Sequence, residues 1–179
     1  MSDAGPITLE TLEHEDAPLL ANLLELYSHD LSGVFGLEVG PDGRFGYDRL
    51  PVYWSEPQRR SAYLIRRGSS IAGFVLTQKG SPLPGLTADQ DVTEFFVLRA
   101  HRDSGVGREA AFQLWDRGTG SWMIRVADGN AAAQAFWEAV IHAYTAGEFS
   151  RDRRTVDGRD WHVFVFASRE RADQVGSAV

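Results

Sequence analysis

The fold is decided by residues 94–108, which read EFFVLRAHRDSGVGR. An apolar run typical of a buried strand leads into a glycine-bearing turn, and the turn opens a helix expected from about Val106 to Arg117. The first backbone N–H groups of a helix have no partner within it, and the helix dipole adds partial positive charge there. Glycines at 105 and 107 carry no side chain that would hold an anion away from these donors. The stretch therefore predicts a phosphate-binding turn.

The residues around the two glycines narrow the kind of phosphate that fits. A P-loop needs lysine followed by serine or threonine, whereas Gly107 is followed by Arg108 and Glu109. A dinucleotide-binding fold needs a third glycine and alternating parallel βαβ units, and the sequence has neither. What remains is R-x-x-G-x-G after a strand, at residues 102–107, and this resembles the pyrophosphate loop of the GNAT acetyltransferase superfamily. A helix that merely begins with glycines after a loop would show the same six residues.

A second block supports the resemblance. After another expected strand, residues 130–137 read NAAAQAFW, which is similar to the GNAT pattern N-x-x-A-x-x-F-Y. The resemblance implies that Asn130 hydrogen-bonds the pantetheine arm of the cofactor, although its side chain would also serve as a helix N-cap. Trp137 stands where the family usually has tyrosine. Two motifs with the right spacing make this chain similar to a GNAT acetyltransferase that uses acetyl-CoA.

The remaining elements give the order β-α-loop-β-β-β-α-β-α-β-β. A first helix is expected to end at Ser32-Gly33, and residues 33–60 to form an irregular segment with at most one short helix. The expected strands cover residues 7–11, 61–66, 71–77, 92–98, 122–126, 144–151 and 161–166, and a further helix covers 130–141. This order predicts an α/β fold of the α+β type, one domain over 1–179, with a mixed sheet of about six to seven strands flanked by helices. Residues 168–179 read as a flexible tail, and the resemblance adds a splayed central strand pair.

Composition excludes several classes of function. The 179 residues contain no cysteine, so thiolate nucleophiles and thiolate metal sites are excluded, and the five scattered histidines predict no metal site. A net charge of −7 argues against nucleic-acid binding and favours the approach of cationic small molecules. No apolar run approaches the roughly 20 residues of a membrane span, and the N-terminus lacks the features of a signal peptide. We therefore expect a cytoplasmic protein without a membrane partner.

The resemblance implies direct transfer of an acetyl group from acetyl-CoA to an amine in a ternary complex. It implies that backbone N–H groups of the strand before the loop bind the thioester oxygen and the pantetheine. The predicted cofactor-binding residues are Phe96, Val97, Leu98, Arg102, Asp103, Ser104, Gly105, Val106, Gly107, Arg108, Asn130 and Trp137.

Acid–base residues are less well defined. Glu94, expected at the start of its strand, is the candidate general base. Asp91 or a water chain could serve instead, and without a catalytic role Glu94 would be a solvated carboxylate at the strand end. The indole of Trp137 is too weak an acid to protonate a thiolate. Tyr144 is therefore the candidate general acid. The alternatives are that the thiolate leaves unassisted and that Tyr144 is a core or hairpin aromatic.

The acceptor is expected to be a primary amine of a small molecule or a peptide. Tyr47, Tyr53 and Trp54 would form an aromatic wall around it, or else cover the core beneath a loop. A cluster of arginines at 151, 153 and 154 is interpreted as a solvated hairpin, with a contact to an anionic acceptor as the alternative. The alternative function is a non-catalytic acyl-CoA-binding sensor, and a third is a nucleotide-phosphate binder unrelated to CoA. The resemblance also allows a homodimer, because GNAT proteins are often dimers.

Overall fold

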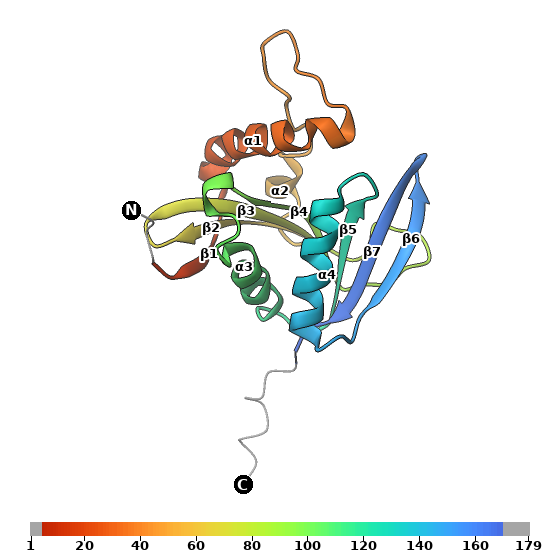
Figure 1. Cartoon of the computed structure of the whole chain (residues 1–179). Coiled ribbons are helices and arrows are strands. Elements are labelled where there is room, and N and C mark those ends of the chain that lie inside the picture. The colour runs from red at the N-terminus through yellow and green to blue at the C-terminus, as the bar shows by residue number, and fades with distance from the viewer. Residues whose placement is uncertain (1–4, 170–179) are drawn as a thin grey trace.

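A seven-stranded mixed sheet forms the centre of the molecule, described over residues 5–169 by a computed structural model (Figure 1). The strands are β1 (Ile7–Thr11), β2 (Arg60–Arg67), β3 (Ser70–Lys79), β4 (Gln90–Val97), β5 (Ser121–Ala127), β6 (Ser150–Val156) and β7 (Arg159–Ala167). They lie in the order β1-β2-β3-β4-β5-β7-β6, and every neighbouring pair is antiparallel except the parallel pair β4–β5. The α/β class and the mixed sheet expected from the sequence are confirmed.

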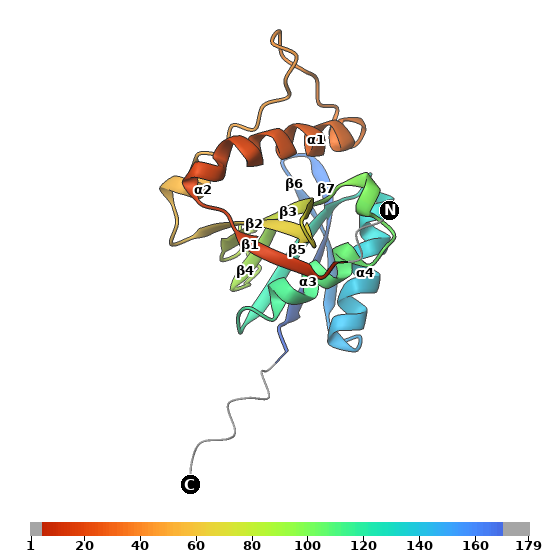
Figure 2. The same ribbon diagram turned by 90° about the vertical axis from the view of Figure 1, so that its left-hand side faces the viewer.

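Helices cover both faces of this sheet. They are α1 (Ala17–Phe35), α2 (Val52–Ser55), α3 (Val106–Trp115) and α4 (Ala131–Thr145), with short 3-10 turns η1 (His14–Asp16) and η2 (Arg99–His101). In Figure 2, α1 and α2 lie on one side of the sheet, and α3 and α4 lie on the other. Each side has its own hydrophobic core: Leu20 and Leu24 of α1 pack with Phe74, whereas Trp115 of α3 packs with Ile141 of α4. Within residues 5–169, no helix has the length and apolar character that a membrane span needs.

Two helix boundaries differ from the sequence expectation. Helix α1 runs past Ser32-Gly33 and ends at Gly36, which adopts a left-handed conformation with φ of 64°. Ser32 is accommodated inside the helix because its hydroxyl donates to the carbonyl of His29 at 2.8 Å. Helix α4 continues through Tyr144, because the buried positions 137, 140, 141 and 144 keep helical spacing. The strand expected from 144 begins only at Ser150.

The parallel pair β4–β5 separates part-way along its length. The two strands pair only at Gln90–Trp122, Asp91–Met123 and Val92–Ile124. Beyond that point β4 stays paired with β3 through Val97, and β5 stays paired with β7 through Ala127. The splayed central pair is therefore confirmed, and it leaves one edge of β4 without a strand partner from residue 93 onward.

A bulge in β4 lies at the point of separation. In the β3–β4 register Leu76 faces Glu94 and Thr77 faces Val92, which leaves Thr93 as an extra residue. A bulge re-aims side chains, and here two consecutive residues both reach the layer of α1 and α2. Thr93 bonds to the hydroxyl of Tyr53 and Glu94 accepts from that of Tyr27. Glu94 thus lies inside the strand, not at its solvated start.

Candidate active site

A cavity of about 470 Å³ opens where β4 and β5 separate. Its walls come from α1, the loop before α2, β4, β5, α4 and β7. Glu94, Tyr27, Tyr47, Arg125, Asn130 and Trp137 are among the lining residues. The volume falls within the range of small-molecule sites, about 300–1,000 Å³. Most of the lining is apolar, with a few polar groups, which is the usual composition of such a site.

Glu94 is the acid that this cavity exposes. Its two carboxylate oxygens accept hydrogen bonds from the hydroxyls of Tyr27 and Tyr47, the latter at 2.8 Å. Burial raises the pKa of the Glu94 carboxyl above its ordinary value, and the two hydrogen bonds offset only part of that rise. Burial also raises the pKa of Tyr27 and Tyr47, so both hydroxyls remain protonated donors. The carboxylate is held in place and is more basic than an exposed glutamate.

Asp91, the alternative base, is occupied elsewhere. It is fully buried, forms a two-point ion pair with Arg125 (2.9 Å to Nη2 and 3.2 Å to Nε) and accepts a hydrogen bond from Gln78 at 2.9 Å. Burial raises the pKa of Asp91, and Arg125 acts against this rise. Asp91 does not line the cavity but fixes Arg125 in its wall. Of the two acids, Glu94 has the geometry of a base.

The loop predicted to bind pyrophosphate has the expected backbone. Asp103 and Gly105 adopt φ values of 56° and 83°, and α3 begins immediately after them. The first hydrogen bond into the helix runs from Glu109 N–H to the Gly105 carbonyl at 3.0 Å, so the N–H groups of residues 106–108 precede the intrahelical ladder. Residues 102–105 and 108 are exposed, which leaves this helix start open to an anion.

The Arg102 side chain, predicted to bind the cofactor, is bonded within the protein. Its Nε donates to the Val97 carbonyl at 2.7 Å, and its Nη2 pairs with Asp30 of α1. Arg99 pairs with the same carboxylate at 2.7 Å. The two arginines therefore tie the loop to α1, and no local sequence signal pointed to Asp30.

The two glycines of the loop have different roles. Glycine is required at 105 by the positive φ of the backbone and not by lack of space, because nothing lies within 4 Å of a Cβ added there. A Cβ on Gly107 would lie 3.0 Å from the Phe136 ring, so this glycine lets α3 approach α4 closely. A guanidinium absent from the sequence prediction also reaches the loop: Arg67 of β2 donates to the Ser104 hydroxyl at 3.1 Å. Arg108 lies over the Phe112 ring.

Asn130 lies at the N-terminus of α4 and lines the cavity. Its side-chain oxygen accepts from Ala133 N–H at 3.1 Å, so the N-cap role is present. Trp137, further along the cavity wall, packs edge-on against Phe95 with ring centres 4.9 Å apart. The structure thus brings both residues of the second motif to the cavity where β4 and β5 separate.

The predicted strand donors are only partly available. Leu98 N–H donates to the Ala72 carbonyl at 2.8 Å, which removes it from a ligand-binding role. N–H groups of an antiparallel strand point alternately to its two edges, so the N–H of Val97 points to the open edge and that of Phe96 to β3. Of the three predicted donors, Val97 is therefore the one whose N–H the splayed pair leaves for a ligand, and the N–H of Phe95 points to the same edge.

Several solved protein structures resemble this chain. The sequence matches no protein-family model and no curated protein. An acetyltransferase from Thermus thermophilus superposes with a TM-score of 0.64 at 19% identity, covering 92% of this chain and 98% of that one. A GNAT-family acetyltransferase structure from Desulfovibrio desulfuricans gives 0.61 at 13% identity over 92% and 100%. The chain has the GNAT fold. A spermidine N-acetyltransferase from Vibrio cholerae, in complex with CoA and spermine, gives 0.59 at 16% identity over 90% and 95%.

Within this GNAT fold, Tyr144 is not brought to the cavity. Its hydroxyl donates to Asp116 at 2.7 Å and accepts from Arg169 N–H at 3.1 Å, and its ring packs against Trp115. Burial, together with Asp116, raises the pKa of Tyr144 to about 12. Tyr144 does not line the cavity that Glu94 lines, so its position does not support the role of general acid. Arg169, assigned to the tail, is held by this contact; residues 170–179 lie outside the described residues.

The three predicted substrate aromatics separate into two groups. Tyr47 lines the cavity and donates to Glu94, whereas Tyr53 is buried with its hydroxyl 2.6 Å from Thr93 Oγ1. Trp54 packs in the core cluster of α1 and α2. Tyr53 and Trp54 therefore cover the core, as the alternative interpretation held. The aromatic cavity residues missed from the sequence are Tyr27, Phe35, Phe95 and Trp161.

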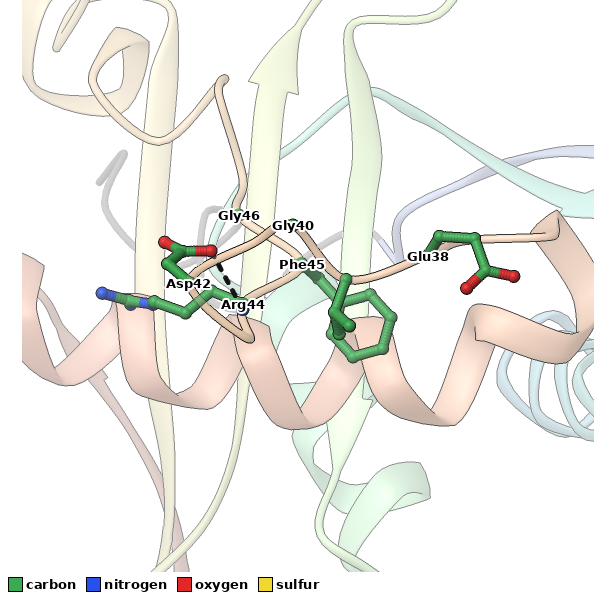
Figure 3. A pocket seen from close by; sticks show the side chains of 7 residues that line it. Glu38, Gly40, Asp42, Arg44, Phe45 and Gly46 are labelled. Carbon is green, nitrogen blue, oxygen red and sulfur yellow. Dashed lines mark hydrogen bonds between the residues drawn. The ribbon is translucent and has the colours of Figure 1, made fainter.

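A second hollow lies outside this site. It measures about 490 Å³ and is lined by residues within 38–46 (Figure 3). These residues belong to the loop that projects beyond α1 (Figure 1). Glu25 of α1 accepts from the N–H groups of Phe45 and Gly46 at 2.8 and 2.9 Å, which fixes the base of the loop next to Tyr47. Within residues 5–169, no group of three or more His, Asp or Glu side chains is arranged to hold a metal ion.

Proposed function

We propose that the chain is an N-acetyltransferase of the GNAT superfamily that transfers an acetyl group from acetyl-CoA to a primary amine. The observation that carries this proposal is the position of Glu94. A partly buried carboxylate with a raised pKa faces a cavity at the splayed strand pair. The open start of α3 lies beyond the same end of β4. A base, a cavity and an anion site are the parts that acyl transfer from a phosphate-bearing thioester needs.

The residues present fit acetyl-CoA. The N–H groups at 106–108 and the positive φ at Gly105 suit a pyrophosphate, and the Arg67 guanidinium adds positive charge beside them. Asn130 and Trp137 at the cavity wall suit the pantetheine arm. Bound acetyl-CoA would supply the acetyl group as an activated thioester. An N–H group on the open edge of β4, that of Val97 or that of the cavity-lining Phe95, would bind the acyl oxygen as negative charge develops on it.

Glu94 would take the proton that the attacking amine loses. The amine nitrogen forms a bond to the acyl carbon, the carbon–sulfur bond breaks, and the electron pair leaves with sulfur. Tyr27 and Tyr47 hold the carboxylate oriented through this step. Since Tyr144 is bonded to Asp116, we assign no side chain to protonate the sulfur.

A thiol-release assay with acetyl-CoA over a panel of amines tests the proposal. We expect turnover with at least one amine and a fall in kcat of about 10²- to 10⁴-fold in Glu94→Gln, the usual contribution of a general base. CoA binding, measured by calorimetry, should not change, because Glu94 bonds to Tyr27 and Tyr47 and to no residue of the loop at 102–108.

Neither of the two side chains considered for sulfur protonation, Trp137 and Tyr144, is suited to it, and this favours one other function, an acyl-CoA sensor without catalysis. Trp137 in place of tyrosine and the engaged Tyr144 hydroxyl are the observations behind it. Tight CoA binding by the wild type without turnover of any amine would establish the sensor and refute the enzyme.

A further inference from the structure

The charged groups of the cavity limit which amine can enter it. Among the described residues that line the cavity, the charged side chains are Glu94, Arg49 and Arg125. One carboxylate therefore faces two guanidinium groups. Because Asp91 pairs with Arg125 behind the cavity wall, the charges of Glu94, Asp91, Arg49 and Arg125 balance, so the cavity does not share the net charge of −7 of the whole chain, from which cationic substrates were expected.

Arg125 is a fixed part of the wall. Its Nε and Nη2 both bond to the buried Asp91, and its guanidinium lies 5.9 Å from the centre of the Trp161 ring. Its third nitrogen, Nη1, has no hydrogen-bond partner within residues 5–169. The side chain is 22% exposed, so the group is oriented by the protein and still accessible.

Arg49 differs from Arg125 because it has no salt bridge within residues 5–169. It is exposed and lies on the loop that also carries Tyr47. Burial raises the pKa of Glu94, and the positive charges of Arg125 and Arg49 both act in the opposite direction, which places each of them within electrostatic range of the carboxylate. An unpaired cation at the wall of a site is available to an anionic group of a ligand.

We propose that the acceptor is a free amino acid, with its amine beside Glu94 and its carboxylate held by Arg49 and Arg125. This inference rests on the proposed acetyl transfer and adds the substrate class. A zwitterion matches one anion and two cations, whereas a polyamine would place a second ammonium group against an arginine. The apolar part of the lining, including Leu31, Phe35 and Leu37, suits an apolar amino-acid side chain.

Matched acceptors test the role of the carboxylate. L-Phenylalanine and 2-phenylethylamine share ring and amine and differ only by the carboxylate. We expect kcat/KM to be about 10- to 100-fold higher for the amino acid, as expected for a charge-assisted contact. In Arg49→Gln this ratio should fall toward one through a higher KM for the amino acid, and Arg49→Lys should restore part of it. Arg59→Gln, an exposed arginine outside the cavity, is the matched control.

Binding without acetyl-CoA separates failure of this inference from failure of the proposed function. L-Phenylalanine should quench the tryptophan fluorescence of the wild type, because Trp137 and Trp161 line the cavity, and should bind more weakly to Arg49→Gln. Arg49-dependent binding without turnover would support the amino-acid site while refuting acetyl transfer. Equal kcat/KM for the two acceptors, better turnover of spermidine, or an equal effect of Arg49→Gln on both acceptors would overturn the inference and leave the transferase intact.

Discussion

At Glu94, burial and hydrogen bonding act on the same carboxyl in opposite directions. The cost of burying an ionised carboxylate exceeds the stabilisation from two tyrosine hydroxyls, so the pKa stays raised. A base of this kind is matched more closely to neutral pH than an exposed glutamate. The sequence pointed to Glu94 from its place before the loop, but its partners Tyr27 and Tyr47 lie 67 and 47 residues away.

The pH dependence of activity should report this environment. With one acceptor held fixed, kcat/KM should rise with pH through an apparent pKa above the ordinary glutamate value of 4.5. The hydrogen bond from Tyr27 lowers the pKa of Glu94, so Tyr27→Phe should shift the rise to higher pH. The same raised pKa affects stability: burial of the ionised Glu94 carboxylate lowers the free energy of unfolding above the folded-state pKa, and this loss is relieved as pH falls through that pKa. A Tyr27→Phe profile that coincides with the wild type would contradict this assignment.

Tyr144→Phe should affect stability and leave catalysis unchanged. The change removes the hydroxyl that joins Asp116 to Arg169 N–H. We expect a loss of about 1 kcal/mol, or roughly 2–4 °C in Tm for a chain of this size, measured by thermal unfolding. A fall in kcat of more than tenfold with an unchanged Tm would restore Tyr144 as the acid.

At the scale of elements, local patterns located most helices and strands. The hairpin of β2 and β3, the strand β4 and the helix α3 lie close to their expected residues. The exceptions were the ends of α1 and α4, the strand β6, which begins at Ser150 instead of Tyr144, and the bulge in β4. Tyr144 was assigned to a strand although it continues the helical spacing of Trp137, Val140 and Ile141, so this error could have been avoided from the sequence. The bulge depends on the register against β3, which is a tertiary property.

Two glycine substitutions should have opposite effects on stability. A Cβ on Gly73 would lie 1.9 Å from the Phe96 carbonyl oxygen, so Gly73→Ala must displace β3 from β4. We expect destabilisation of about 1–3 kcal/mol. Gly33→Ala should stabilise by about 0.5–1 kcal/mol, because nothing lies within 4 Å of a Cβ there, inside α1. Denaturant unfolding measures both, and a stable Gly73→Ala variant would contradict the close approach of β3 and β4.

At the scale of the whole molecule, two layers of helices meet a sheet that opens in the middle. The layer of α1 and α2 supplies Tyr27 and the loop with Tyr47, the opposite layer supplies Asn130 and Trp137, and the cavity joins them. The single domain over 1–179, the homodimer and the cytoplasmic location stay predictions.

Ligand stabilisation should distinguish CoA from other phosphate compounds. A ligand at about 100 times its Kd stabilises the folded state by about 2.7 kcal/mol, or about 5–11 °C in Tm for a chain of this size. We expect this shift with CoA and a much smaller one with ATP at equal concentration, since the cavity offers walls for a pantetheine arm. A larger shift with ATP would favour a nucleotide-phosphate binder.

The sequence by itself predicted the proposed donor site of this protein. A phosphate-binding turn is built from backbone groups of consecutive residues, so the pattern at 102–107 and the N-cap at Asn130 were readable locally. Only the tertiary structure brings together the residues of the proposed acceptor site. Side chains far apart in sequence, such as Glu94, Tyr27, Arg49 and Arg125, meet there only after the sheet splays and α1 packs across it. Their burial, pairing and charge then decide which of them can act.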